Sequence, residues 1–226
     1  YFEGKGVEQD YKKAKEYFEK ACSFGNSKAY LFLGILYYGF KEYELDLVKA
    51  KECFEKAAEF GCSEAFNYLG ELYAGEQNHT KAKEYFEKAG ELGDSDALVQ
   101  LGFYYIRDEF GPDYTKSREY LEKAAKLGNS NAYFAIGLYY VEGKGVEQDY
   151  RKAIEYFEKA AELGNSMALK QLGIFYSKGE GVEQNYKKAK GYFEKAADLG
   201  DSDALRNLGI FYENGHGVEP DYTKAK

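Results

Sequence analysis

The chain alternates two kinds of segment in which apolar residues recur at the spacing of an α-helix. In the stretch 150–163, the apolar positions are Tyr150, Ala153, Tyr156, Phe157, Ala160, Ala161 and Leu163. Charged residues fill positions between them, at Arg151, Lys152, Glu155, Glu158 and Lys159. This pattern places apolar side chains on one face of a helix and charged ones on the other. It predicts an amphipathic helix, and similar stretches recur along the chain.

Two short sequence motifs, called phrases below, recur in these segments at nearly constant intervals. The first, [D/N]-x-x-x-A, has its alanine at Ala14, Ala50, Ala82, Ala153, Ala189 and Ala225, with Ser117 in the remaining copy. The second, usually L-G-x-x-Y, has its glycine at Gly34, Gly70, Gly102, Gly137, Gly173 and Gly209. The step is 32 residues from Ala50 to Ala82 and 36 from Ala14 to Ala50. Such a period is typical of solenoids, whose units bury their apolar faces against neighbouring units.

Each period contains two predicted helices, which we name helix A (with the glycine phrase) and helix B. Helix B starts at an Asp or Asn that can cap its N-terminus: Asp10, Asp46, Asn78, Asp113, Asp149, Asn185 and Asp221. It ends at a glycine suited to the left-handed conformation: Gly25, Gly61, Gly93, Gly128, Gly164 or Gly200. The distance from a helix-B alanine to the next glycine phrase stays at 20 residues, as from Ala14 to Gly34. Length variation is therefore confined to the connection after helix A.

One stretch shows the whole repeat nearly intact. Residues 168–176 read A-x-x-x-L-G-x-x-Y, residues 179–182 read G-x-G-V, and residues 188–200 read K-A-x-x-Y-F-x-K-A-A-x-x-G. These units resemble Sel1-like repeats, and the resemblance covers the whole chain. Tetratricopeptide repeats are the near alternative, but they carry a tryptophan and a terminal proline that are missing here. The resemblance implies an all-α, right-handed α/α superhelix of antiparallel helix pairs that acts as an adaptor or scaffold.

We expect one continuous solenoid with half-units at both ends. The half-units are 1–25 and 201–226, and the complete units are about 26–61, 62–93, 94–128, 129–164 and 165–200. Terminal repeats usually carry a polar outer face, and neither end shows one, so we expect a segment of a longer protein. Because the first half-unit lacks a helix A and the last lacks most of a helix B, head-to-tail self-association is an alternative role.

Composition narrows the classes of partner. The net charge of −8 argues against a nucleic-acid surface. No apolar run approaches the roughly 18 residues of a membrane span, so we expect no membrane insertion. Cys22, Cys53 and Cys62 occupy three different repeat positions, which favours reduced structural thiols and a cytosolic setting.

The sequence shows no pattern of residues that is typical of an active site. His79 and His216 are the only histidines, and roughly four repeats separate them, so they cannot share a metal or a proton. The Gly143–Val146 loop and its relatives follow a helix, whereas a phosphate-binding loop follows a strand. We therefore predict no catalytic, cofactor-binding or metal-binding residues, and a protein that is not an enzyme.

The far side of helix A is the surface on which the repeats differ most. At about 100° per residue, the sixth position after the anchor alanine points away from helix B, and we name its occupants the A-helix ladder: Ile35, Glu71, Phe103, Leu138, Ile174 and Ile210. Inner helices line the concave side of two-helix solenoids, so an apolar ladder there predicts a groove for a partner helix or peptide. The predicted partner-binding residues are Leu31, Phe32, Ile35, Tyr68, Val99, Phe103, Phe134, Leu138, Lys170, Ile174, Arg206 and Ile210. Internal packing and self-association are the alternative explanations.

Overall fold

A computed structural model describes residues 10–39, 44–107 and 111–215, which form twelve α-helices and no strand. The helices are α1 (Tyr11–Cys22), α2 (Ser27–Tyr37), α3 (Leu47–Glu59), α4 (Ser63–Gly75), α5 (His79–Glu91), α6 (Ser95–Ile106), α7 (Tyr114–Lys126), α8 (Ser130–Glu142), α9 (Tyr150–Glu162), α10 (Ser166–Lys178), α11 (Tyr186–Asp198) and α12 (Ser202–Asn214). Odd-numbered helices are the predicted B helices, and even-numbered ones are the A helices. The all-α repeat fold predicted from the sequence is confirmed.

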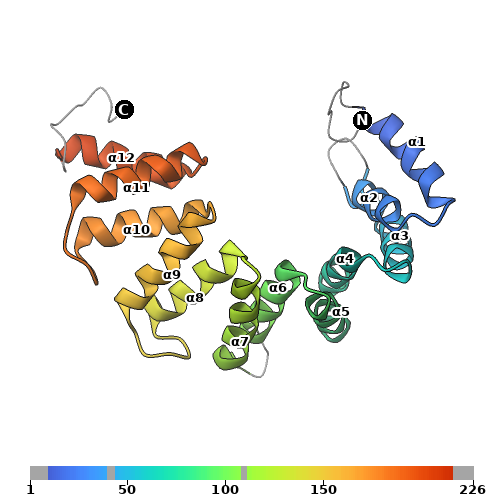
Figure 1. The fold of residues 1–226 in the computed structure, drawn as a ribbon, viewed down its shortest axis with the longest axis horizontal. Coiled ribbons are helices and arrows are strands. Elements are labelled where there is room, and N and C mark those ends of the chain that lie inside the picture. Colours follow the sequence, from blue (N-terminus) through green and yellow to red (C-terminus); the bar gives the residue numbers. More distant parts are fainter. Residues whose placement is uncertain (1–9, 40–43, 108–110, 216–226) are drawn as a thin grey trace. The chain divides into compact units, whose positions relative to one another are not determined.

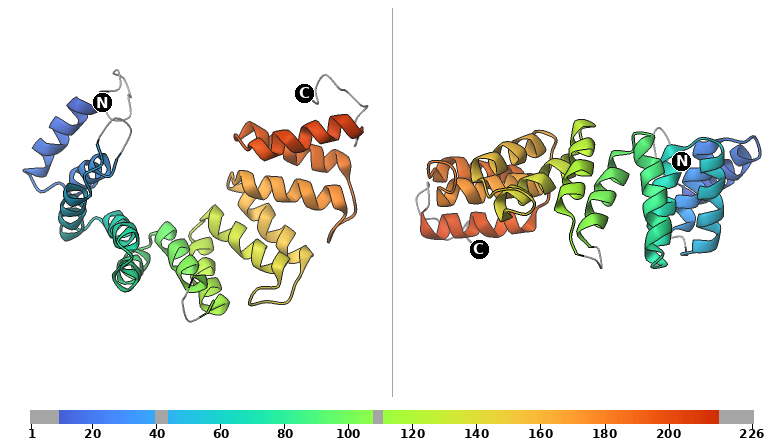
Figure 2. Two further views of the ribbon diagram at one scale, coloured as in Figure 1. Left: turned by 180° about the vertical axis from the view of Figure 1, so that it is seen from behind. Right: turned by 90° about the horizontal axis from the view of Figure 1, so that it is seen from below.

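The chain divides into two compact parts, which we call unit 1 and unit 2 and describe separately. Each contains several of the predicted repeats. Unit 1 comprises Tyr1–Leu101 and unit 2 comprises Gly102–Lys226, so the division falls within α6. In unit 1, α1 to α5 each pack against the next helix along the chain (Figure 1). In unit 2, α7 to α12 do the same, and α9 to α12 lie side by side in every view (Figures 1 and 2). Each helix thus covers its neighbours in sequence, as expected of stacked repeats.

In four A helices the repeated glycine makes room for a phenylalanine ring from the following B helix, and in α6 Gly102 makes room for Leu121. Phe54, Phe86, Phe157 and Phe193 are at most 2% exposed. A Cβ at Gly70 would lie 2.6 Å from the ring of Phe86. Gly34, Gly137 and Gly173 meet the other three rings in the same way. The repeated glycine therefore lets a phenylalanine ring pack directly against the helix backbone.

The predicted helix caps of the B helices are confirmed wherever the structure describes them. The side chains of Asp10, Asp46, Asn78, Asp113, Asp149 and Asn185 accept hydrogen bonds of 2.9–3.2 Å from backbone amides of the first turn. Asp221 lies outside the described residues. The tight turn before helix A adds a second set of caps that sequence analysis missed: Asn26, Asp94, Asn129, Asn165 and Asp201. Both ends of the tight turn are therefore fixed by its own sequence.

The G-x-G-V loops of unit 2 need glycine for two reasons. Gly145 has a φ of +67°, in the left-handed region that favours glycine. A Cβ at this position would also lie 2.5 Å from the Cβ of Tyr114. Gly181 repeats the arrangement one repeat later, against Tyr150. These loops lie close to the start of the preceding B helix, and the contact accounts for their glycines without a phosphate ligand.

Candidate functional site

The described apolar side chains of the A-helix ladder are neither fully buried nor fully exposed. Phe103, Leu138 and Ile174 are half-buried, and Ile210 is 44% exposed. Ile35, Leu138 and Ile174 each pack against a buried cluster of their own unit, so part of each side chain faces the core. The rest of each side chain stays accessible to solvent or a partner.

Two of the predicted partner-binding residues are buried. Leu31 and Val99 are each 6% exposed, and Leu31 belongs to the core cluster of Ala50 and Phe54. Both occupy the second position after the anchor alanine. The same position in α10 is Lys170, whose ammonium contacts the following A helix. That position therefore faces the next repeat, and we remove Leu31 and Val99 from the candidate surface.

Aromatic members of the predicted set are held by rings of their own unit. Phe32 stacks on Phe18 with centroids 5.3 Å apart, and Tyr68 stacks on Phe54 at 4.8 Å. Phe134 lies 5.6 Å from Phe157. All three are half-buried, so each offers part of its ring to the surface in a fixed orientation.

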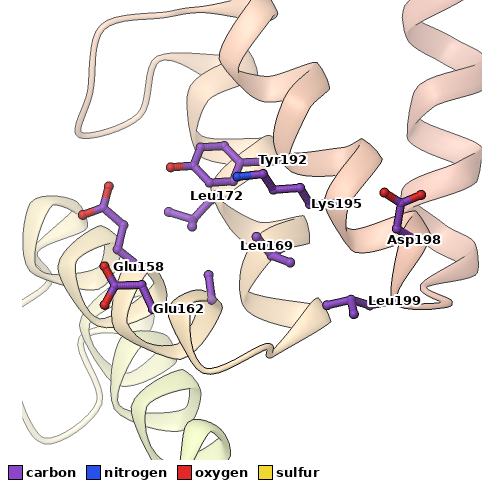
Figure 3. Close-up of a pocket in the computed structure, with 9 residues that line it drawn as sticks. Glu158, Glu162, Leu169, Leu172, Tyr192, Lys195, Asp198 and Leu199 are labelled. Carbon is purple, nitrogen blue, oxygen red and sulfur yellow. The ribbon is translucent and has the colours of Figure 1, made fainter.

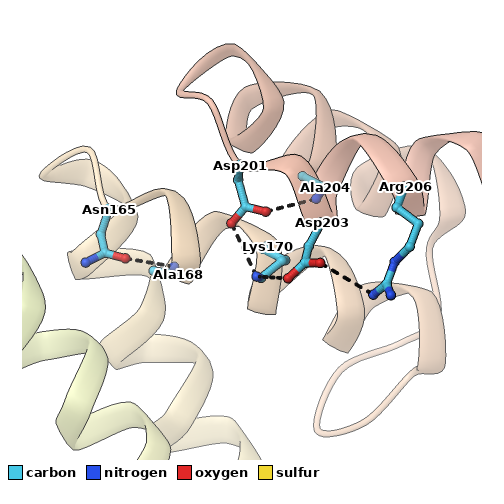
Figure 4. A network of polar contacts seen from close by, with 7 residues as sticks. All are labelled: Asn165, Ala168, Lys170, Asp201, Asp203, Ala204 and Arg206. Atoms are coloured by element: carbon cyan, nitrogen blue, oxygen red, sulfur yellow. Dashed lines mark hydrogen bonds and ion pairs between the residues drawn. The ribbon is translucent and has the colours of Figure 1, made fainter.

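The predicted basic residues of unit 2 are already paired with aspartates (Figure 4). Lys170 Nζ lies 2.9 Å from an oxygen of Asp203 and 3.3 Å from an oxygen of Asp201. The hydrogen bond to Asp203 and the negative charge of both aspartates raise the pKa of Lys170, so this side chain stays charged. Arg206 lies 3.8 Å from Asp203 and its side chain is 71% exposed. Arg206 is therefore the more accessible cation for a partner.

Unit 1 carries acidic groups at the equivalent place. Glu71 occupies the ladder position of Ile174, and Asn67 occupies the position of Lys170. Burial raises the pKa of Glu71, and the negative charges of Asp94 and Asp96 raise it further. Within the described residues no lysine or arginine pairs with Glu71. The Oδ1 atom of Asn67 is buried without a hydrogen-bond donor in the described part of the chain.

A pocket of about 650 Å³ lies between the B helices α9 and α11 (Figure 3). Leu169 and Leu172 of α10 lie between those two helices in its lining. Charged and polar side chains from the B helices complete it: Glu158, Glu162, Tyr192, Lys195 and Asp198. None of the A-helix ladder residues lines this pocket. Sequence analysis missed it, although the residue that leaves the space open can be read from the repeat alignment.

The described residues contain no grouping of three His, Cys, Asp or Glu side chains that could hold a metal ion. His79 is exposed at the first residue of α5, and His216 lies outside the described residues. Burial raises the pKa of both Cys53 and Cys62 to about 11, so these thiols stay protonated at neutral pH. None of the twelve helices in the described part has the length and apolar character that crossing a membrane requires.

These features define an α/α solenoid in which similar helix pairs stack and the exposed helix faces carry the chemical differences. The chain belongs to the Sel1 repeat family. Seven Sel1 repeats match it, at residues 1–26, 27–61, 63–94, 95–129, 130–165, 166–201 and 202–226. The resemblance found in the sequence is therefore confirmed. Sel1 repeat proteins are generally non-enzymatic scaffolds for protein interactions.

Solved structures of bacterial proteins have the same fold. A protective antigen of uropathogenic Escherichia coli with an SLR fold is 33% identical, with a TM-score of 0.79. That match covers 93% of this chain and 46% of the antigen, so the chain spans less than half of that protein. A Sel1 repeat protein from Oxalobacter formigenes is 29% identical, with a TM-score of 0.84 and coverage of 93% and 88%. No curated protein matches the sequence.

Proposed function

We propose that this chain is an interaction scaffold whose A helices bind a helix or extended peptide of a partner protein. The partial exposure of the A-helix ladder is the observation that supports this role. A ladder that served only internal packing would be buried like Phe54, which is 0% exposed, whereas Phe103, Leu138 and Ile174 are half-buried although further helices follow each of them. Half-buried residues that are fixed on their core side present an ordered apolar surface, which lowers the entropic cost of binding.

The proposed partner carries apolar side chains at helical spacing. Ile174 and Ile210 occupy the same position in successive A helices, and charged residues lie beside them, at Lys170 and Arg206. A helix-in-groove complex uses apolar anchors of this kind, with polar groups at the rim to set the register. Lys170 is held by Asp201 and Asp203, so the exposed Arg206 is the cation that suits an acidic residue of the partner.

The test is affinity capture with matched charge variants. The double variant Ile174→Glu, Ile210→Glu places two carboxylates on the proposed surface. The control Leu127→Glu, Leu163→Glu alters two leucines that are 54% and 49% exposed at the ends of B helices. We expect partners captured by the wild type and the control to be lost by the ladder variant. Equal capture by both variants would contradict the proposal.

End-to-end self-association is the alternative role, and light scattering separates it from partner binding. A self-associating chain gains mass with concentration, whereas a monomeric scaffold keeps a constant mass. Running the ladder variant in the same experiment shows whether any association uses Ile174 and Ile210. Constant mass together with ladder-dependent capture supports the scaffold function.

A further inference from the structure

An aromatic ring fills the space between successive B helices in three places. The ring comes from the residue directly after the anchor alanine of helix A: Tyr30, Phe66 and Tyr133. Phe66 stacks on Tyr85 of the next B helix with centroids 6.3 Å apart. Tyr133 approaches Tyr156 at the same distance, and Tyr30 stacks on Phe60 at 5.7 Å. The space therefore accepts a six-membered ring against the next B helix.

The pocket between α9 and α11 is the place where such a ring is missing. Leu169 stands at the equivalent position, and its side chain is shorter and not planar. Tyr156 has two ring neighbours, Tyr140 with centroids 5.5 Å apart and Tyr133 at 6.3 Å. Tyr192 stacks on Tyr176 at 5.5 Å, but among the described residues no second ring accompanies it.

The space beside a leucine at this position depends on the residue that faces it from the preceding B helix. In α6 the equivalent residue is Leu98, but there the preceding B helix carries Gly90 in place of alanine. A Cβ at Gly90 would lie only 2.6 Å from Cδ2 of Leu98, so this leucine packs directly on the helix backbone. The preceding helix of the pocket carries Ala161 instead, at the pocket wall. The pocket therefore lies where a leucine follows a B helix that carries alanine and where the next B helix, α11, supplies the opposite wall.

The charges at the pocket favour a particular kind of ring. Three carboxylates line it, from Glu158, Glu162 and Asp198, against the single ammonium of Lys195. The lysine equivalent to Lys195 one repeat earlier, Lys159, lies 5.9 Å from the ring of Tyr133 and 5.3 Å from that of Tyr156. A ring bound beside Tyr192 would meet a lysine in the same way. The remaining carboxylates favour a cation next to that ring.

We propose that this pocket binds an aromatic side chain of a partner peptide, next to an arginine or lysine in the partner's sequence. The guest ring stacks on Tyr192 over Leu169, where Tyr133 and Phe66 place rings of the chain itself. The adjacent cation pairs with the carboxylates of Glu158 and Glu162. The site is separate from the A-helix ladder, so it extends the scaffold to a second point of contact.

The test uses a blocked peptide, acetyl-Gly-(para-fluorophenylalanine)-Arg-Gly-amide, followed by fluorine NMR. The variant Leu169→Tyr supplies the missing ring from within the chain, as Tyr133 does one repeat earlier. We expect saturable binding to the wild type and a loss of affinity of at least about tenfold in this variant. Leu205→Tyr is the matched control, since Leu205 is the next equivalent position and is 59% exposed. It should bind as the wild type does.

Two further measurements, one with a leucine peptide and one with the variant Glu162→Lys, test the proposal even if Leu169→Tyr alters the fold. A peptide with leucine in place of the fluorinated ring, followed by proton NMR, should bind at least about tenfold more weakly, because it cannot stack on Tyr192. Glu162→Lys should weaken binding of the arginine peptide. Circular dichroism reports whether each variant is folded. Equal affinity of folded Leu169→Tyr and wild type, or of the two peptides, would overturn the proposal.

The converse variant builds the same pocket in unit 1. Phe66 fills the space between α3 and α5, and the charges at the equivalent positions are the same: Glu55, Glu59, Lys88 and Glu91. Phe66→Leu should therefore add a second peptide site of similar affinity, because Ala58 stands where Ala161 stands in unit 2. An unchanged stoichiometry of one peptide per chain in the folded variant would count against the role of the missing ring.

Discussion

Helices α4 and α10 occupy the same place in the repeat, but the polar groups around them are balanced in opposite ways. In unit 2, Lys170 of α10 contacts Asp201 and Asp203 at the start of the next A helix. In unit 1, the equivalent aspartates are Asp94 and Asp96, and the position of the lysine is occupied by Asn67. The two aspartates therefore face a lysine position in unit 2, whereas the equivalent position in unit 1 is an asparagine, which carries no charge.

The difference affects both stability and binding. Near α4, the pKa of Glu71 and that of Asp94 are both raised, chiefly by burial, so each carboxylate is held there at a cost. Near α10, Lys170 lowers the pKa of Asp203 through a hydrogen bond and its charge. A repeat scaffold can therefore keep its packing constant while a single position sets the charge of its surface. In the described residues, Glu71 and Asp94 of unit 1 lie without a lysine at this place, whereas Lys170 of unit 2 pairs with both aspartates.

The largest effect is expected from breaking the network in unit 2. Lys170→Met should lower the free energy of unfolding by about 1–2 kcal/mol, because Asp201, whose side chain is 8% exposed, loses its cation. The methionine retains most of the apolar stem of lysine. Urea unfolding and hydrogen exchange of the α10 and α12 amides measure the loss.

The control for this prediction is Lys178→Met, which removes a lysine that lies 3.6 Å from Glu180, with the two side chains 58% and 42% exposed. Exposed pairs of this kind contribute about 0.2–1 kcal/mol. Equal losses in the two variants would mean that the network in unit 2 contributes no more than an ordinary surface pair.

A smaller effect of opposite sign is expected from copying the lysine into unit 1. Asn67→Lys should raise the free energy of unfolding by about 1 kcal/mol, because it removes a buried oxygen without a donor and supplies a cation to Asp94 and Glu71. Carbon NMR of the Glu71 carboxyl should show a lower pKa in this variant. Destabilisation, or an unchanged pKa of Glu71, would show that the two units do not share this geometry.

Much of this comparison was readable from the sequence, and the reason is the repeat itself. Helix positions, B-helix caps and the small residue against Phe54 or Phe86 recur in many copies, so each copy supports the others. The ion network was missed because Lys170 and Asp201 belong to successive repeats, and no periodic pattern indicates which side chains meet. Leu31 and Val99 were placed on the surface because a single-helix projection ignores the neighbouring repeat.

The pocket between α9 and α11 also depends on contacts that the periodic pattern does not indicate. Leu169 differs from Tyr133 and Phe66 at one position, and that difference is visible when the repeats are aligned. Its consequence also depends on Ala161 of the preceding helix, since the equivalent leucine in α6, Leu98, packs on Gly90, where a Cβ would lie 2.6 Å from its Cδ2. Single departures from a repeat can therefore be located from sequence, but the volume they create depends on a second residue that lies near it only in the fold.

The smallest expected effect is the pH dependence that Glu71 confers on unit 1. Because the folded protein raises the pKa of Glu71, this group contributes stability that is fully present below its unfolded pKa of about 4.3 and is lost as the pH rises through the folded value. Glu71→Gln is neutral at every pH. The variant should be more stable than the wild type at pH 7, by less than about 1 kcal/mol, and the difference should vanish as the pH approaches 4. Hydrogen exchange of the α4 amides at both pH values measures this, with the α10 amides as the internal reference because Ile174 replaces the carboxylate there. A constant difference between variant and wild type across this range would mean that Glu71 titrates at its ordinary pKa, and the contrast between α4 and α10 would then rest on the lysine alone.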